Sequence, residues 1–114
     1  MSGQPYTPQG KTYLIQADTT PPTGVQVLSA GTLQSVTYRI ANPEANETIF
    51  YSMVATSAAD AKTLCVLPTA GTPTYVTPLP PGGVEVVRGP AGAYFSGITR
   101  TAAAKLYVTP GDGI

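Results

Sequence analysis

Proline and glycine interrupt this 114-residue chain so often that only short segments remain between them. The interruptions include the pair Pro21-Pro22, the Asn42-Pro43 step, the Pro-rich stretch 68–83 and the Gly-Pro-Ala-Gly sequence at 89–92. The last of these predicts a hairpin-like turn between the segments on either side of it. Proline has no backbone N–H for a hydrogen-bond ladder, and glycine favours turns. The chain therefore has no room for a fold of long helices, and its ordered segments must be short.

The segments between these turns are rich in β-branched and aromatic residues, which favour strands. In residues 33–40, Val36, Tyr38 and Ile40 alternate with polar residues, which is typical of a half-buried strand. Residues 47–55 are more apolar and predict a central strand that is buried near its middle on both faces. Strands are expected at 11–18, 25–28, 33–40, 47–55, 63–67, 84–88, 93–98 and 105–109, with an edge segment at 74–77 and about two turns of helix at most in 56–62.

About eight short strands at spacings near 8–12 residues are typical of a sandwich. We therefore predict an all-β fold, a single β-sandwich that is either jelly-roll or immunoglobulin-like. The sandwich domain is expected to span residues 11–114. Residues 1–10, with Pro5 and Pro8 and no periodicity, predict an extended N-terminal arm.

Charge and composition restrict the function. Six basic residues balance six acidic ones, and charged residues make up 11% of the chain against about 25% in an ordinary domain. A nucleic-acid partner is not expected, because such binders need a surplus of Lys and Arg. Histidine is absent and Cys65 is the single cysteine, so neither a disulfide within the chain nor a structural zinc site is predicted. We interpret Cys65 as a small buried apolar side chain.

Catalysis needs a positioned base, a nucleophile or a metal. Glu85 begins an expected strand, and five acidic residues fall in or beside expected turns: Asp18, Glu44, Glu47, Asp60 and Asp112. Nothing in their spacing selects two of them as the paired carboxylates of a glycosidase. The glycine-rich sequences at 80–83 and 89–92 lack the Gly-Lys-Ser/Thr ending of a phosphate loop. We predict that the protein is not an enzyme and that it uses no cofactor and no metal.

Neither a signal peptide nor a membrane span is expected, since the N-terminus has no basic start and no run of about 18 apolar residues occurs. Synthesis in the cytoplasm follows as an expectation. Such a weakly charged, neutral surface is typical of a subunit packed against others. A symmetric homo-oligomer, a dimer or a trimer, is therefore predicted.

Four residues are the candidate contacts with a partner protein. Tyr6 and Pro8 lie in the expected arm, and Tyr75 lies in the Pro-rich connection; aromatic side chains commonly anchor interfaces. Arg88 is a candidate for an interfacial ion pair. The other five tyrosines fall in expected strands, where core packing explains them. An exposed tyrosine also suits sugar binding, and the sequence leaves the two roles open.

The sequence Ala-Tyr-Phe-Ser-Gly-Ile-Thr at 93–99 and the ending Lys-Leu-Tyr-Val-Thr-Pro-Gly-Asp-Gly at 105–113 resemble small virion proteins of tailed bacteriophages. The chain looks most like their capsid decoration, or cement, proteins. The resemblance implies a β-sandwich on the outer surface of the phage head that bridges major capsid subunits and carries no catalytic residues. It also implies that an arm such as residues 1–10 reaches a neighbouring subunit.

Two other functions compete with this one. The first is a tail or fibre module that recognises host polysaccharide through an exposed tyrosine such as Tyr75. The second is a small hydrolase, which the lack of histidine and of metal ligands disfavours.

Overall fold

The computed structural model describes residues 7–8, 10–28 and 36–112. These residues form short strands and one helix, which confirms the all-β prediction. In chain order the elements are β1 (Thr7–Pro8), β2 (Tyr13–Ala17), β3 (Val25–Gln26), β4 (Val36–Ala41), β5 (Ile49–Val54), α1 (Ala58–Thr63), β6 (Thr77–Leu79), β7 (Val84–Gly89), β8 (Tyr94–Ile98) and β9 (Ala104–Asp112).

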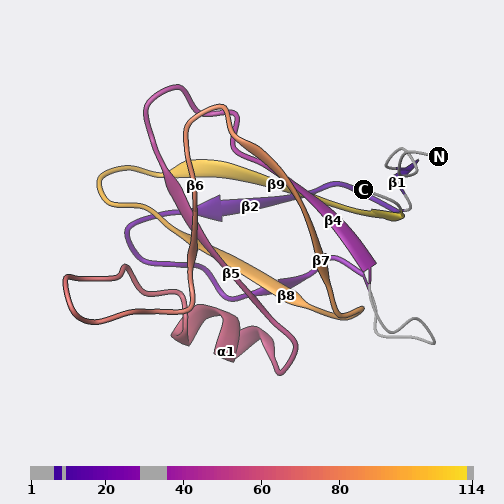
Figure 1. Cartoon of the computed structure of the whole chain (residues 1–114), viewed down its shortest axis with the longest axis horizontal. Coiled ribbons are helices and arrows are strands. Elements are labelled where there is room, and N and C mark those ends of the chain that lie inside the picture. The colour runs from indigo at the N-terminus through magenta and orange to yellow at the C-terminus, as the bar shows by residue number, and fades with distance from the viewer. Residues whose placement is uncertain (1–6, 9, 29–35, 113–114) are drawn as a thin grey trace.

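The strands form two antiparallel sheets (Figure 1). Sheet 1 has the order β2-β9-β4-β7, and β1 continues the line of β2 along the same edge of β9. Sheet 2 has the order β3-β8-β5-β6. The pairing is nested: β5 pairs with β6, β4 with β7, β3 with β8, and β2 with β9. Successive pairs alternate between the sheets, so the chain runs like one long hairpin wrapped around a common core.

The core lies between the two sheets, where apolar side chains from both pack together. Tyr38 from β4 meets Phe95 from β8 with ring centroids 4.9 Å apart and the planes inclined at 67°. Tyr38 also donates a hydrogen bond from Oη to the Pro90 carbonyl at 2.6 Å. The predicted alternation in β4 is confirmed by Val36, Tyr38 and Ile40, all buried, and by exposed Arg39; Thr37 is buried as well. Strand β5 is central in sheet 2 and buried from Ile49 to Ser52, as predicted.

Helix α1 confirms the helical character expected at 56–62. Ser57 caps it by accepting a hydrogen bond from the Asp60 backbone N–H. The strand predicted at 63–67 is wrong. The backbone N–H groups of Leu64, Cys65 and Val66 bond to carbonyls only two to four residues earlier, so they are not available to a sheet.

Three smaller predictions are also corrected. The turn at 89–92 joins β7 in sheet 1 to β8 in sheet 2, so it links the sheets and does not close a hairpin. The edge segment predicted at 74–77 begins later, at Thr77, and among the described residues it pairs with β5 alone. Strand β9 runs on through Pro110 to Asp112. Pro110 lies between the stretches of β9 that pair with β2 and β1, so its missing N–H removes no hydrogen bond from that edge.

Candidate interaction surface

The outer face of sheet 1 carries an exposed apolar row. In an antiparallel sheet, residues directly opposite each other share a face. Ala41 on β4 is opposite Val84 on β7 and Tyr107 on β9, and Tyr107 is opposite Leu14 on β2. We call Val84, Ala41, Tyr107 and Leu14 the apolar row. It crosses all four strands, and Leu14 and Val84 are each 50% exposed.

Strand β7 extends this apolar surface at the edge of the sheet. Its side chains alternate strictly: Val84, Val86 and Arg88 are exposed, whereas Glu85 and Val87 turn inward and are half-buried. Val86 is 40% exposed and lies beside the row. Large aliphatic side chains that are contiguous on a flat face mark protein interaction sites more often than scattered ones do.

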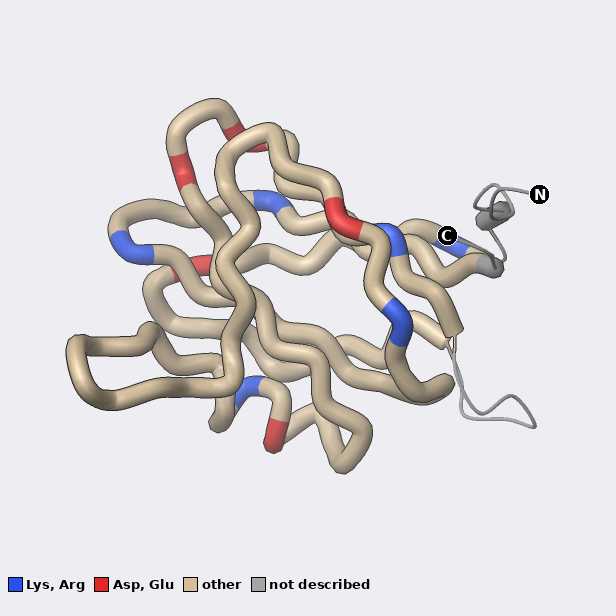
Figure 2. Tube along the Cα trace, in the orientation of Figure 1, with Lys and Arg blue, Asp and Glu red and all other residues tan. Residues whose placement is uncertain are grey.

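Two guanidinium groups flank the apolar residues. Arg39 on β4 is opposite Val86, and Arg88 on β7 is opposite Thr37, so the two arginines are diagonal neighbours on this face. Both side chains are exposed, and no ion pair to either is found within the part of the chain that the structure describes. Figure 2 shows how sparse charge is along the chain, with long uncharged stretches between single charged positions.

Strand β7 also has an open edge. It pairs with β4 on one side, and its other side has no strand partner among the described residues. The edge strands of sheet 2 are protected differently: β3 has two residues, and β6 has three with Pro78 in the middle. Strand β7 has six residues and no proline. An open edge of this length readily accepts a further strand.

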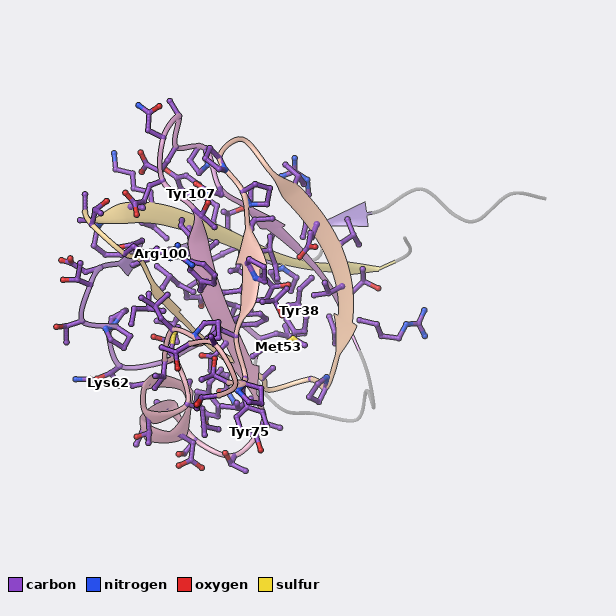
Figure 3. The ribbon with its side chains drawn as sticks, turned by 60° about the vertical axis from the view of Figure 1, so that its left-hand side comes forward. Tyr38, Met53, Lys62, Tyr75, Arg100 and Tyr107 are labelled. Carbon is purple, nitrogen blue, oxygen red and sulfur yellow. The ribbon has the colours of Figure 1, made fainter. Side chains whose placement is uncertain are left out.

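The predicted contact residues fall in different places. Arg88 lies on the outer face of sheet 1, as just described. Tyr75 is 75% exposed in the connection before β6, and Figure 3 shows it on the side of α1, away from Tyr107. Pro8 pairs through its backbone position with Gly111 at the end of β9, and Tyr6 lies outside the described residues. The structure therefore does not bring Arg88 and Tyr75 together.

The apolar residues of this face were not predicted from the sequence. Val84 and Val86 fall in the strand expected at 84–88, but Arg88 was the one residue of that strand predicted to contact a partner. The available signal was the alternation of these valines with Glu85. Alternation alone does not say which face turns outward.

A small cleft lies between the loop before β5 and the loop after β8. Its volume is about 330 Å³, and its lining comprises Asn46, Glu47, Thr48, Phe50, Arg100 and Thr101. Arg100 lies over the Phe50 ring at 5.3 Å from its centroid. Glu47 accepts a hydrogen bond from the Thr101 hydroxyl at 2.7 Å. The aromatic ring and the carboxylate are therefore both occupied by neighbouring residues of the chain.

Three further acidic residues also have hydrogen-bond partners within the chain. Glu44 accepts a hydrogen bond from the Lys105 backbone N–H at 2.8 Å, and Asp60 accepts one from the Thr56 hydroxyl at 2.6 Å. Glu85 accepts one from the Tyr51 hydroxyl at 2.9 Å. Burial raises the pKa of Tyr51, and the Glu85 carboxylate beside it raises that pKa further. No group of three or more Cys, Asp and Glu side chains that could hold a metal ion occurs among the residues described.

Cys65 is buried and unpaired, as predicted. Its Sγ lies 3.6 Å from the Phe50 carbonyl oxygen. Burial raises the pKa of the Cys65 thiol, which keeps the sulfur in its unreactive protonated form.

No family model, curated protein or solved structure matches the chain. Within the described ranges, no helix is long and apolar enough to cross a membrane.

Proposed function

We propose that this protein is a non-enzymatic virion structural subunit, a capsid decoration protein that binds the outside of a phage head and bridges major capsid subunits. We further propose that its two sheets form a β-sandwich of the jelly-roll type with an extended N-terminal arm. The nested pairing supports the jelly-roll assignment, because that fold is a sandwich of eight strands in two Greek keys. The resemblance of residues 93–99 and 105–113 to such proteins points to the same function.

The apolar row on the outer face of sheet 1 is the observation that carries the proposal. A row that crosses four strands, with Leu14 and Val84 half exposed, is a surface that water solvates poorly. Covering it against a capsid subunit would remove that apolar area from water. The low charge of the chain fits the same role, since a surface covered by neighbours needs few charges to prevent aggregation.

Multivalent contact would make such a subunit effective. A dimer or trimer would place several copies of the face on adjacent capsid subunits, so each added contact forms at high effective concentration. Rupture of the shell would then require many modest contacts to break together. Preferential binding to the expanded shell would also stabilise that state by mass action.

The proposal is tested by adding the purified protein to heads assembled by a phage from whose genome the gene for this protein has been deleted. We expect wild-type protein to sediment with the heads at a fixed ratio to the major capsid protein. The double variant Val84→Ser and Val86→Ser should lose this binding. Val66→Ser is the matched control, because Val66 is 49% exposed and lies in the connection after α1 rather than on sheet 1. Failure of the wild-type chain to bind heads would contradict the proposal.

The alternative function, a tail or fibre module for host polysaccharide, has one favourable observation. The Tyr75 side chain is 75% exposed, and an exposed aromatic ring is a suitable platform for a sugar. Binding on a glycan array that disappears with Tyr75→Ala would support this alternative. The cleft near Phe50 supports it less, since Arg100 already covers that ring.

A further inference from the structure

We infer that the outer face of sheet 1 docks on a protein surface that presents carboxylates beside apolar side chains. This inference rests on the proposed function and adds the chemistry of the partner. It is drawn from the two arginines that flank the apolar row.

The placement of these arginines is unfavourable in the isolated chain. Arg39 and Arg88 are diagonal neighbours on adjacent strands, and like charges at that spacing repel each other. The six residues of β7 contain one carboxylate, Glu85, and it turns inward to bond the Tyr51 hydroxyl.

The carboxylate side chains that the structure describes on other elements do not offset the pair either. The side chains of Glu44, Glu47 and Asp60 are bonded at loops or at α1, and Asp18 accepts a hydrogen bond from Thr19 at the end of β2. Lys105 is the third cation on this face, but Glu44 contacts its backbone. The inference therefore rests on Arg39 and Arg88 alone. A carboxylate supplied by a partner would be attracted by both guanidinium groups at once.

The valines next to the arginines narrow the partner further. Val84 and Val86 lie on the same strand as Arg88, so a partner that reaches the arginines also covers exposed aliphatic carbon. A nucleic acid would pair with the cations but would leave these valines against phosphate and sugar, and tight binding to it needs more cations than two. A second copy docked through the same face would bring four arginines together. A carboxylate-bearing protein surface satisfies both features.

Charge reversal with a matched control tests this inference. The double variant Arg39→Glu and Arg88→Glu is compared with Lys62→Glu and Arg100→Glu, which makes the same change in net charge elsewhere on the molecule. Lys62 lies on α1 and Arg100 on the loop after β8, and Figure 3 shows both on the side away from β7. All four side chains are exposed, so the melting temperature of the Arg39/Arg88 variant should stay close to that of the wild type. The control loses the contact of Arg100 with the Phe50 ring and should melt slightly lower, so the binding of both variants is measured well below their melting temperatures.

Binding to heads that lack this protein is measured by sedimentation at about 50 mM and about 300 mM NaCl. We expect the Arg39/Arg88 variant to bind about 10- to 100-fold more weakly at low salt and the control to stay within about 2-fold. Wild-type affinity should fall as the salt rises. The inference is overturned if the wild type binds and the Arg39/Arg88 variant binds equally well, or if a DNA duplex binds the wild type and competes with the heads. If the wild type does not bind the heads at all, the proposed function fails, and this inference fails with it.

Discussion

Phe95→Ala is the substitution that should weaken the packing of the two sheets most directly. Phe95 is fully buried on β8, and its ring packs edge-on against Tyr38 of the other sheet. Replacing a buried Phe with Ala costs about 3–5 kcal/mol, and this figure includes the aromatic pair, which is worth about 0.5–1.5 kcal/mol. A chain of this length is expected to have about 6–17 kcal/mol of total stability, so the loss is a large fraction of it.

Urea unfolding followed by circular dichroism measures this loss. With a slope of about 2 kcal/mol per molar urea, a loss of about 4 kcal/mol lowers the midpoint by about 2 M. Tyr75→Ala is the control and should change the stability by less than about 0.5 kcal/mol, because its side chain is exposed. If Phe95→Ala does not fold, Phe95→Leu should still lower the midpoint measurably. A shift below about 0.3 M for Phe95→Ala would refute the conclusion that this ring joins the sheets.

Three further predictions test other parts of the fold. Asn42→Ala should lower the free energy of unfolding by about 2–4 kcal/mol in urea titrations, because the buried Asn42 side-chain amide donates hydrogen bonds to three backbone carbonyls and the substitution removes all three bonds; a loss below about 0.5 kcal/mol would contradict this. Gly24→Ala should lower the free energy of unfolding, measured by thermal denaturation, by about 1–3 kcal/mol, because the added methyl group would lie 2.5 Å from the Ala61 Cβ of α1. Adding Ala61→Gly to the Gly24→Ala variant should recover part of this loss. Burial raises the pKa of the Cys65 thiol above its unfolded value of about 8.5, so as the pH rises the unfolded chain releases this proton before the folded chain does. The free energy of unfolding should therefore fall as the pH rises above about 8.5, and Cys65→Ala should reduce that fall in urea titrations made below and above this pH. The same dependence of the free energy on pH in Cys65→Ala and in the wild type would count against this prediction.

Local patterns predicted much of the fold, and they failed where a long-range partner or a helix cap decided the structure. The alternation around Tyr38 and the apolar density of β5 located two central strands correctly. Residues 63–67 have the composition of a strand, but α1 ends there and its last turn uses their backbone N–H groups. Pro110 suggested the end of β9, yet it is accommodated between the stretches paired with β1 and β2. The strands that pair with β9, namely β4, β2 and β1, lie about 65 to 105 positions earlier in the chain, and no local window contains that information.

The candidate surface was predicted only through Arg88. That Arg88 shares one face of the strand with Val84 and Val86 was visible in the sequence, but the sequence does not reveal which face of β7 meets sheet 2. That choice follows from the pairing with β4, which also places Arg39 diagonally to Arg88. The charge pattern of the face therefore exists only once the two strands are aligned, since the residues are far apart along the chain.

The most direct test of the central claim is a cryo-electron microscopy map of phage particles that carry the chain. The account predicts density for the two-sheet domain on the outer surface of the shell, with sheet 1 facing the capsid subunits and Val84, Val86 and Arg88 of β7 at the contact. Carboxylates of the capsid protein should lie beside Arg39 and Arg88. Particles without this density would contradict the proposed function. Density in which sheet 1 faces solvent would contradict the assignment of this face as the docking surface.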